Sequence, residues 1–470
     1  MIVWTHGLIN RLVRLGDLVA LAVATTFAWA LGWPEPIGLS VAQGIFLLAL
    51  ILALYNRVAI QTNAYRVEHY RVLTRTMAEP LVALVLACAA ACFLLAVFLP
   101  ASFEAPATLA VWGGCLVLFL FGHRLITRVL VTHAFRSALL RRRVAIIGAL
   151  DRTSDMVESL LDPGQHNTFE LVGIYDDRGP DRRPETVGGV PVSGTIDKLR
   201  EAVRDGHVDM IIIALPWTAA VRIQGMLERL QGFSADVVIP FEGNDFRLNF
   251  SNVVRIAGMP SLQVAHRPLK GSQGLLKVIE DKVVAGLGLL VAGPVLLAAA
   301  LAIKLDSPGP VLFRQPRVGF NNRNFDCFKL RTMTIDRNDD GTRGTTRDNP
   351  RITRVGRFLR KTSIDELPQL LNVLRGDMSI VGPRPHVPNM LIGNHTYLEA
   401  VREYAYRCRV KPGITGWAQI NGGRGTITTV DKAKKVVAFD IFYIENWSLW
   451  LDFKIMLRTI FGGMSGKDAY

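Results

Sequence analysis

Four apolar stretches within the first 122 residues constrain the fold of this chain more than any other feature. They cover residues 17–33, 37–55, 80–99 and 107–122, and each approaches the roughly 20 residues that a helix needs to cross a bilayer. The first stretch is followed by another apolar run, whereas a signal peptide would be followed by a cleavage site and a mature domain. We therefore predict that residues 1–140 form a bundle of four transmembrane helices.

Basic residues are distributed unevenly over the segments that flank these stretches. The loops at residues 34–36 and 100–104 contain no Lys or Arg. The other flanking segments contain Arg11, Arg14, Arg57, Arg66, Arg71, Arg75, Arg124, Arg128, Arg136 and Arg141 to Arg143. The positive-inside rule then places both ends of the bundle in the cytoplasm. The alternative, buried helices of a soluble protein, does not predict this asymmetry.

The composition agrees with a membrane protein that handles anionic substrates. Half of the residues are hydrophobic, the mean hydropathy is +0.27 and the net charge is +14, which favours an anionic leaflet or phosphorylated substrates. We predict no nucleic-acid partner, because the sequence has no zinc-finger spacing and no RNP-like motif. Five cysteines without a CxxC pair indicate neither a zinc site nor a disulfide framework, and they suit a reducing, cytoplasmic face.

Residues 141–242 alternate between strand and helix patterns. Strands are predicted at 143–148, 170–175 and 210–215, and helices at about 154–161 and 196–205. This alternation indicates a parallel, Rossmann-like sheet. The dinucleotide fingerprint is degenerate, since only Gly148 remains at the first turn and Asp151 would repel a phosphate. We therefore predict a structural or regulatory module without a cofactor, followed by a linker with short strands at residues 243–274.

A fifth apolar run, residues 283–303, has Gly293 and Pro294 at its centre. Proline removes a helical hydrogen bond and favours a kink. Residues 271–470 contain 29 Lys and Arg against 18 Asp and Glu, a balance that favours the cytoplasmic side. We predict a re-entrant helix over residues 280–304, which enters the inner leaflet, breaks near Pro294 and returns. The alternative is an ordinary kinked transmembrane helix.

Two adjacent carboxylates beside a row of guanidinium groups are the clearest sign of chemistry. Asp365 and Glu366 follow a ladder of arginines spaced every three residues, Arg351, Arg354, Arg357 and Arg360. Arg384 lies between two prolines in a block that follows, where the restricted backbone can aim its side chain. One carboxylate can attack a phosphate ester, the other can hold a divalent cation, and arginines can neutralise phosphate oxygens. For the ladder, the alternative is a basic helix face on anionic lipid headgroups; for Arg384, it is a solvated surface turn.

Two local structures are compatible with this pair. If Asp365 is a helix N-cap, Pro368 occupies the third helical position, where its missing N–H costs no bond, and the helix terminus favours an ionised carboxylate. If Ser363 is the N-cap, Ser363 and Glu366 form a capping box and Pro368 falls inside the helix. We favour the first structure, because proline inside a helix is costly.

Several further motifs occur in a fixed order around this pair. A rigid turn at residues 306–310 leads to the segments 314–319 and 325–333, and a glycine-rich segment follows at 411–425. Lys329 and Arg331 lie on a predicted strand and point to the same face, so both can meet a phosphate or remain exposed cations. This order of motifs resembles the bacterial sugar transferase family, the polyprenyl-phosphate hexose-1-phosphate transferases. The resemblance covers about residues 275–470 closely, and the front half looks like that of the larger members.

The resemblance completes the predicted fold class. We expect a membrane protein of the α + α/β class with a four-helix transmembrane bundle, a degenerate Rossmann-like α/β domain and a membrane-embedded α/β catalytic domain at residues 275–470. The catalytic domain would contain the re-entrant helix hairpin and lie on the cytoplasmic face of the bacterial inner membrane.

The resemblance also implies a reaction. A hexose 1-phosphate would pass from a UDP-sugar to undecaprenyl phosphate, with release of UMP, through a covalent phospho-sugar enzyme. Asp365 occupies the nucleophile position, and Glu366, with Asp365 beside it, the magnesium site; Mg²⁺ suits one or two carboxylates together with phosphate oxygens. The basic residues expected to contact the substrates are Arg360, Arg384, Arg357, Lys329 and Arg331. We also expect contact with inner-membrane lipid and a homodimer.

The sugar is less well marked than the reaction. Glucose is the first expectation and galactose or another UDP-hexose the alternative, because no motif marks a pocket for the hexose. Cys408 stands where close relatives often carry His, which puts sugar choice or rate in question. Residues 440–454 are predicted to form one aromatic amphipathic helix on the membrane surface, with core packing as the alternative.

Two functions of other classes compete with the transferase. An NAD-dependent nucleotide-sugar modifier could use the Rossmann-like domain, but the degenerate glycine fingerprint counts against it and it leaves Asp365 and Glu366 without a role. An inactive membrane scaffold is the other, and the intact acidic and basic motifs argue against it.

Overall fold

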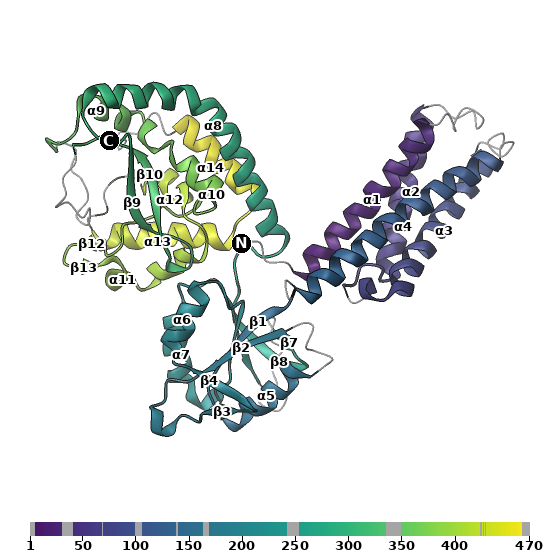
Figure 1. The fold of residues 1–470 in the computed structure, drawn as a ribbon, viewed down its shortest axis with the longest axis horizontal. Helices are drawn as coiled ribbons and strands as arrows, with labels where there is room; N and C mark the ends of the chain where they lie inside the picture. Colours follow the sequence, from purple (N-terminus) through teal and green to yellow (C-terminus); the bar gives the residue numbers. More distant parts are fainter. Residues whose placement is uncertain are drawn as a thin grey trace. The chain divides into compact units, whose positions relative to one another are not determined.

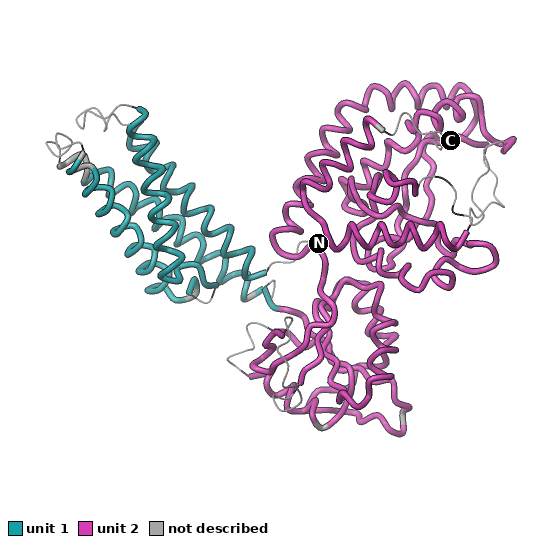
Figure 2. The backbone as a smooth tube through the Cα atoms, turned by 180° about the vertical axis from the view of Figure 1, so that it is seen from behind, with its two compact units in different colours: residues 1, 3–141 teal, residues 2, 142–470 magenta. Residues whose placement is uncertain are grey.

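The computed structural model describes residues 5–30, 41–67, 69–98, 106–137, 140–162, 169–241, 253–334, 349–423, 425, 427 and 429–462. The chain divides into two compact units, residues 3–141 and 142–470 (Figure 2). The first unit is helical. The second contains an eight-stranded sheet and, from residue 272 onward, a mostly helical part that carries the predicted site.

Four long helices make up the first unit. They are α1 (His6–Ala30), α2 (Val41–Gln61), α3 (Leu73–Phe98) and α4 (Pro106–Arg136), with the short turn η2 (His69–Arg71) between α2 and α3. Their shared core includes Leu21, Tyr55, Leu84 and Leu116, one buried side chain from each helix. By length and composition all four helices can cross a membrane, which confirms the predicted apolar helices.

The helices extend beyond the apolar runs at the ends that carry basic residues. At that level Asp17 on α1 accepts hydrogen bonds from Nε and Nη2 of Arg124 on α4, at 2.9 and 2.5 Å, and from the hydroxyl of Tyr55 at 2.8 Å. Asp17 and Arg124 are both buried. A buried charge is tolerated only when it is paired and hydrogen-bonded, so this ion pair joins α1 to α4 where the apolar runs end.

The large sheet opens the second unit. Its eight strands are β1 (Arg142–Ile147), β2 (Phe169–Tyr175), β3 (Thr186–Val187), β4 (Val190–Gly194), β5 (Met210–Ile213), β6 (Asp236–Pro240), β7 (Val253–Ile256) and β8 (Met259–Ala265), in the order β3-β4-β2-β1-β5-β6-β8-β7 (Figure 1). The helices are α5 (Asp151–Leu161), α6 (Ile196–Arg204) and α7 (Ala220–Leu230), with short turns η4 (Pro180–Arg182) and η5 (Trp217–Ala219). The central strands β4, β2, β1, β5 and β6 run parallel, so the predicted Rossmann-like alternation is confirmed.

Strand β8 continues this sheet beyond its parallel part. It pairs antiparallel with β6 and with β7. The segment predicted as a linker, residues 243–274, therefore contributes two strands to the sheet, and its residues 243–252 lie outside the described part of the chain. Apolar alternation in these strands is too short to show from sequence which sheet they join.

The remaining elements surround a second core. They are α8 (Ser272–Asp306), β9 (Leu312–Val318), η6 (Phe320–Asn322), β10 (Asn324–Leu330), α9 (Arg354–Lys361), η7 (Ile364–Glu366), α10 (Gln369–Arg375), β11 (Ser379–Val381), β12 (Leu391–Ile392), β13 (His395–Thr396), α11 (Tyr397–Ala400), η8 (Arg402–Arg409), β14 (Gly413–Thr415), α12 (Trp417–Ile420), α13 (Val430–Glu445) and α14 (Leu449–Gly462). Strands β9 and β10 form an antiparallel hairpin, and β11 pairs parallel with β14. The core between them includes Cys327, Val373, Val381 and Tyr443.

Helix α8 remains helical through Pro294 over 35 residues, so the predicted break is not an interruption of the helix. Its ribbon nevertheless changes direction part-way along (Figure 1), as expected where proline removes one hydrogen bond. Its N-terminal half is tied to the core, because Lys277 donates to Asp452 at 2.7 Å and Asp281 accepts from Ile380 N at 2.9 Å. Its apolar side chains are mostly exposed, and by length and composition this helix also can cross a membrane.

The C-terminal aromatic segment is two helices rather than the single helix predicted for residues 440–454. Helix α13 ends at Glu445, and α14 begins at Leu449, whose entry is stabilised by Ser448 Oγ accepting from Leu451 N at 3.1 Å. The turn between the two helices leaves Tyr443 buried in the core and Trp450 71% exposed. The period of the apolar residues alone does not reveal this turn.

Candidate active site

The two predicted carboxylates lie on a tight turn between α9 and α10. Ser363 follows α9 in the left-handed conformation, with φ 55° and ψ 17°, which is uncommon for a residue with a side chain. The 3₁₀ turn Ile364–Glu366 comes next, and Pro368 is the N-cap of α10. Neither predicted cap is present: Asp365 does not cap α10, and Ser363 makes no side-chain cap. The local sequence could not show that a left-handed residue and a 3₁₀ turn both lie between α9 and α10.

Glu366 is the electrostatic centre of the site. Its Oε1 accepts a hydrogen bond from Lys329 Nζ on β10 at 2.9 Å and one from Arg384 Nη2 after β11 at 2.6 Å. Burial alone would raise the pKa of Glu366, but Arg384 and Lys329 hold it well below its usual value. The structure thus brings together three residues predicted from separate motifs, and Glu366 is ionised at neutral pH.

Asp365 has a different environment from its neighbour. Its side chain is 8% exposed, and among the described residues none donates a hydrogen bond to it. Burial, followed by the charge of Glu366, raises the pKa of Asp365 to about 6, against the opposing effect of Lys329, Arg360 and Arg384. At pH 7 Asp365 is therefore mostly ionised, desolvated and unshielded by hydrogen bonds, which is the state an attacking carboxylate needs.

The predicted arginines of α9 differ in their distance from the carboxylates and in their partners. Arg360 lies beside the carboxylates and donates from Nε to Thr332 Oγ1 at 2.9 Å. Arg357 is exposed on α9 and has no side-chain partner among the described residues.

Arg331 lies apart from the cations that bind Glu366, and its guanidinium binds backbone carbonyl groups instead. It is 6% exposed and donates to Pro308 O and Ser307 O at 2.9 and 2.6 Å, which satisfies carbonyl groups beyond the end of α8. The prediction assumed that the strand continues to residue 331, but β10 ends at Leu330 and the side chain no longer follows the two-residue period of Lys329.

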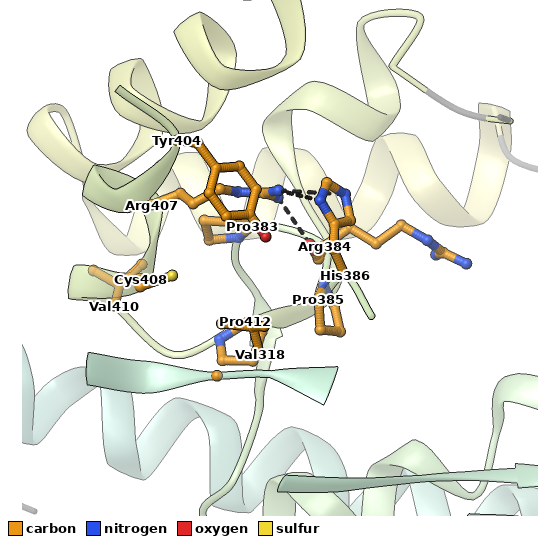
Figure 3. Close-up of a pocket in the computed structure, with 11 residues that line it drawn as sticks. Val318, Pro383, Arg384, Pro385, His386, Tyr404, Arg407, Cys408, Val410 and Pro412 are labelled. Carbon is orange, nitrogen blue, oxygen red and sulfur yellow. Dashed lines mark hydrogen bonds between the residues drawn. The ribbon is translucent and has the colours of Figure 1, made fainter. Parts of the chain in front are cut away.

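The loop that carries Arg384 is held by its carbonyl groups. Two of its four residues are prolines, which have no N–H to donate. Arg407 Nη2 donates to Arg384 O at 2.8 Å, Arg317 Nη1 to Pro385 O at 3.2 Å, and the amide of Val318 to His386 O at 2.9 Å. Figure 3 shows the small pocket beneath this loop, with the guanidinium of Arg384 pointing away from it. The loop is thereby fixed with Arg384 aimed at Glu366.

Close backbone contact explains the glycines on either side of this loop. A Cβ on Gly382 would lie 2.5 Å from Lys411 O, and one on Gly413 would lie 2.1 Å from Gly382 N. Such distances are impossible for a side chain without movement of the backbone. The glycines let β11 and β14 run side by side immediately before Pro383.

Arg407 is a residue of this region that the sequence did not reveal. It is 4% exposed, pairs with Asp440 on α13 at 2.8 Å and donates to His386 Nδ1 at 2.7 Å. The pKa of His386 lies well below its usual value because of burial and the charge of Arg407, so His386 is the neutral acceptor. The sequence offered only the adjacent Cys408 as a point of interest, and Asp440 is 33 residues further along the chain.

Comparison with known proteins adds to this geometry. Residues 272–466 match the family model described as bacterial sugar transferase, and residues 61–239 match one described as CoA-binding domain. The UDP-glucose:undecaprenyl-phosphate glucose-1-phosphate transferase of Escherichia coli (strain K12) is 40% identical over 332 residues, which are 70% of this chain and 69% of that protein.

The chain belongs to the bacterial sugar transferase family. A second relative, the undecaprenyl-phosphate glucose phosphotransferase of Komagataeibacter xylinus, is 41% identical over 361 residues, or 76% of this chain and 66% of the relative. A third, named UDP-glucose:undecaprenyl-phosphate glucose-1-phosphate transferase in Caulobacter vibrioides, is 50% identical over 196 residues, 42% of this chain and 72% of its own length. The family predicted from the motifs is thus confirmed.

The CoA-binding match in this bacterial sugar transferase raises the question of whether its sheet holds such a cofactor. Asp176, after β2, accepts from Ala149 N at 2.8 Å, and Arg178 Nε donates to Asp176 while its Nη2 donates to Ala149 O. The N–H of Ala149, which precedes the N-cap of α5, is therefore already bound to a carboxylate. The carboxylate of Asp176 thus occupies one backbone donor of the turn at which the glycine fingerprint is degenerate.

A magnesium ion fits the site of this family member better. Glu366 is ionised, and within the described part of the chain its Oε2 has one hydrogen bond, a long one of 3.4 Å from Arg384 Nη1. The described residues contain no group of three or more His, Cys, Asp or Glu arranged to hold a metal. An ion would thus rest on one or two carboxylates with the remaining ligands from phosphate oxygens and water, which is the coordination that Mg²⁺ prefers.

Proposed function

We propose that this protein transfers glucose 1-phosphate from UDP-glucose to undecaprenyl phosphate and releases UMP. The observation that carries the proposal is the pairing of a desolvated Asp365 with an ionised Glu366 that Lys329 and Arg384 hold in place. The relatives from Escherichia coli and Klebsiella pneumoniae are named for this reaction and are 40% and 39% identical over 70% of this chain. Such a step would begin a polysaccharide repeat unit.

Two displacements account for the arrangement of the side chains. A carboxylate oxygen of Asp365 attacks the phosphorus that carries the sugar, and the bond to the bridging oxygen of UMP breaks. A phosphate oxygen of undecaprenyl phosphate then attacks the same phosphorus and frees Asp365. Arg360, Arg384 and Lys329 neutralise phosphate oxygens in both steps, and the exposed Arg357 can meet a phosphate at the rim. Mg²⁺ bound at Glu366, with Asp365 beside it, would supply further charge neutralisation to the diphosphate.

The membrane arrangement forms part of the same proposal. We place helices α1 to α4 across the bacterial inner membrane as a bundle, with α8 entering the cytoplasmic leaflet and returning, bent at Pro294. The catalytic part then lies on the cytoplasmic face, in contact with inner-membrane lipid and within reach of a lipid-linked acceptor. We also propose a homodimer, for which purified protein in detergent can be tested by its mass.

The function is tested by UMP release from the purified protein with undecaprenyl phosphate. We expect release with UDP-glucose and Mg²⁺, loss of activity with EDTA, and recovery when Mg²⁺ is added in excess, because the diphosphate charge is otherwise not balanced. UDP-galactose and UDP-N-acetylhexosamines serve as competing donors, since a relative named for N-acetylgalactosamine is 43% identical over 176 residues. Faster release with one of these would reject glucose but retain the reaction, and activity unchanged by EDTA would reject the magnesium requirement.

The raised pKa of Asp365 predicts an acid limb in the rate profile. Because Asp365 must be ionised to attack and its pKa is about 6, kcat/KM should fall about tenfold for each pH unit below 6. An ordinary aspartate would keep its activity to about pH 4. The measurement is initial rates of UMP release from pH 4.5 to 8, with samples held at low pH and returned to pH 7.5 to show that the protein is intact. A constant kcat/KM down to pH 5 would contradict the assignment.

A further inference from the structure

Arg317 on β9 is a guanidinium in this region that none of the predicted roles uses. Strand pairing sets Arg317 opposite Phe325 and Phe313 opposite Lys329, so Arg317 and Lys329 lie on the same face of the β9–β10 hairpin. This face is the one from which Lys329 reaches Glu366. Arg317 therefore belongs to the same surface as the cations already assigned to the site.

The hydrogen bonds of Arg317 leave its charge uncompensated. Nη1 donates to Pro385 O at 3.2 Å and Nη2 to Gln315 Oε1 at 2.6 Å, and both partners are neutral. Its Nε is buried without a hydrogen-bond partner. Within the described chain no carboxylate forms an ion pair with Arg317. Of the five N–H groups of its guanidinium, two donate hydrogen bonds. A partly buried cation without an anion is costly unless a ligand supplies the anion.

The charge balance of the surroundings points in the same direction. The basic side chains that act on the two carboxylates or on one another are Lys329, Arg360, Arg384 and Arg317. Four cations thus face Asp365 and Glu366, which leaves an excess of two positive charges. Burial and the nearby Arg384 lower the pKa of Arg317, which agrees with a cation that lacks a counter-ion. A diphosphate ester carries the charge that this excess requires.

We propose that Arg317 is a second anion-binding guanidinium of the site, which together with Arg384 binds the phosphate oxygens of a diphosphate ester. The proposal rests on the proposed function for the identity of that ester, the UDP-sugar. Gln315 and Pro385 hold the guanidinium by two of its edges, so the remaining N–H groups are preorganised rather than mobile. Arg317 is then a specificity residue for diphosphate over monophosphate.

The test compares Arg317→Gln with Arg314→Gln. Arg314 lies on the same strand but on the opposite face, is exposed and stacks over Phe328, so its substitution makes the same change of charge away from the site. Binding of UDP, UMP, uridine and inorganic pyrophosphate to the full-length protein is measured by calorimetry. We expect Arg317→Gln to weaken UDP and pyrophosphate binding about 10- to 100-fold, UMP less and uridine hardly at all, with Arg314→Gln unchanged.

Other outcomes separate the proposal from its alternatives. Equal weakening of UDP and uridine would show that Arg317 only positions the Pro385 loop and would overturn the proposal, as would UDP affinity within twofold of wild type. Should Arg317→Gln fold poorly, Arg317→Lys retains the charge without the fork, and an intermediate UDP affinity with unchanged uridine binding is the supporting result. If the wild type released no UMP from UDP-glucose but bound pyrophosphate through Arg317, the anion site would stand and the proposed function would fall.

Discussion

Asp365→Asn is expected to lower the rate of UMP release by on the order of 10³-fold or more, with UDP affinity little changed. The amide has nearly the same shape as the carboxylate but cannot attack phosphorus. The site would keep its cations, because Lys329 and Arg384 bind to Glu366 rather than to Asp365. Single-turnover UMP release and UDP binding, measured on the same preparation, check both parts. Release at the wild-type rate would show that another group is the nucleophile.

The same substitution should make the protein more stable. The pKa of Asp365 is raised from 3.8 to about 6 on folding, so ionised Asp365 destabilises the native state fully above pH 6 and not at all below pH 3.8. Removal of that charge is worth about 2 kcal/mol at pH 7, on the basis of about 1.4 kcal/mol per pKa unit with some loss to solvent screening. Wild type should approach the stability of Asp365→Asn as the pH falls from 6 toward 4.

Thermal unfolding in detergent across this pH range measures the difference. Asp326→Asn is the matched control, because Asp326 lies on β10 but is exposed and outside the site. We expect no change in the midpoint for the control. If Asp365→Asn were less stable than wild type at pH 7, ionised Asp365 would not destabilise the native state and the prediction would be wrong.

Arg407→Met is expected to destabilise the protein by about 3–5 kcal/mol, because it leaves Asp440 buried without its partner. It also removes the donors to Arg384 O and to His386. The loop that carries Arg384 would lose one of the hydrogen bonds to its carbonyl groups, so KM for UDP-glucose should rise in the fraction that folds. Unfolding by denaturant in detergent and steady-state kinetics are the measurements.

The double substitution Arg407→Met with Asp440→Leu distinguishes the two roles of Arg407. An apolar pair in place of a buried ion pair is often neutral for stability, so the double variant should recover most of the lost stability. It should not recover KM, because no donor to Arg384 O returns. Recovery of both would mean that Arg407 acts through the ion pair with Asp440 alone, and recovery of neither would mean that local packing controls this region.

The cations of the site illustrate how far periodicity carries a prediction. Lys329 and Arg331 are two residues apart and were expected on one face, yet only Lys329 reaches Glu366, because β10 ends between them. Arg317 lies on the same face as Lys329 by the pairing of β9 with β10. The register of this pairing depends on contacts across the hairpin. The sequence motif that contains Arg317 could not show it, and so no role was predicted for Arg317.

The sequence by itself determined the features that depend on local pattern. Long apolar runs require helices able to cross a membrane, alternating strands and helices require the Rossmann-like sheet, and the ordered motifs identify the family and the pair Asp365 and Glu366. Only the tertiary structure decided which cations meet Glu366, that Asp176 binds the turn before α5, and that Arg407 and Arg317 hold the loop of Arg384. These contacts join residues far apart in the chain, and their energies depend on burial and on the distance between charges. Neither quantity exists until the chain has folded.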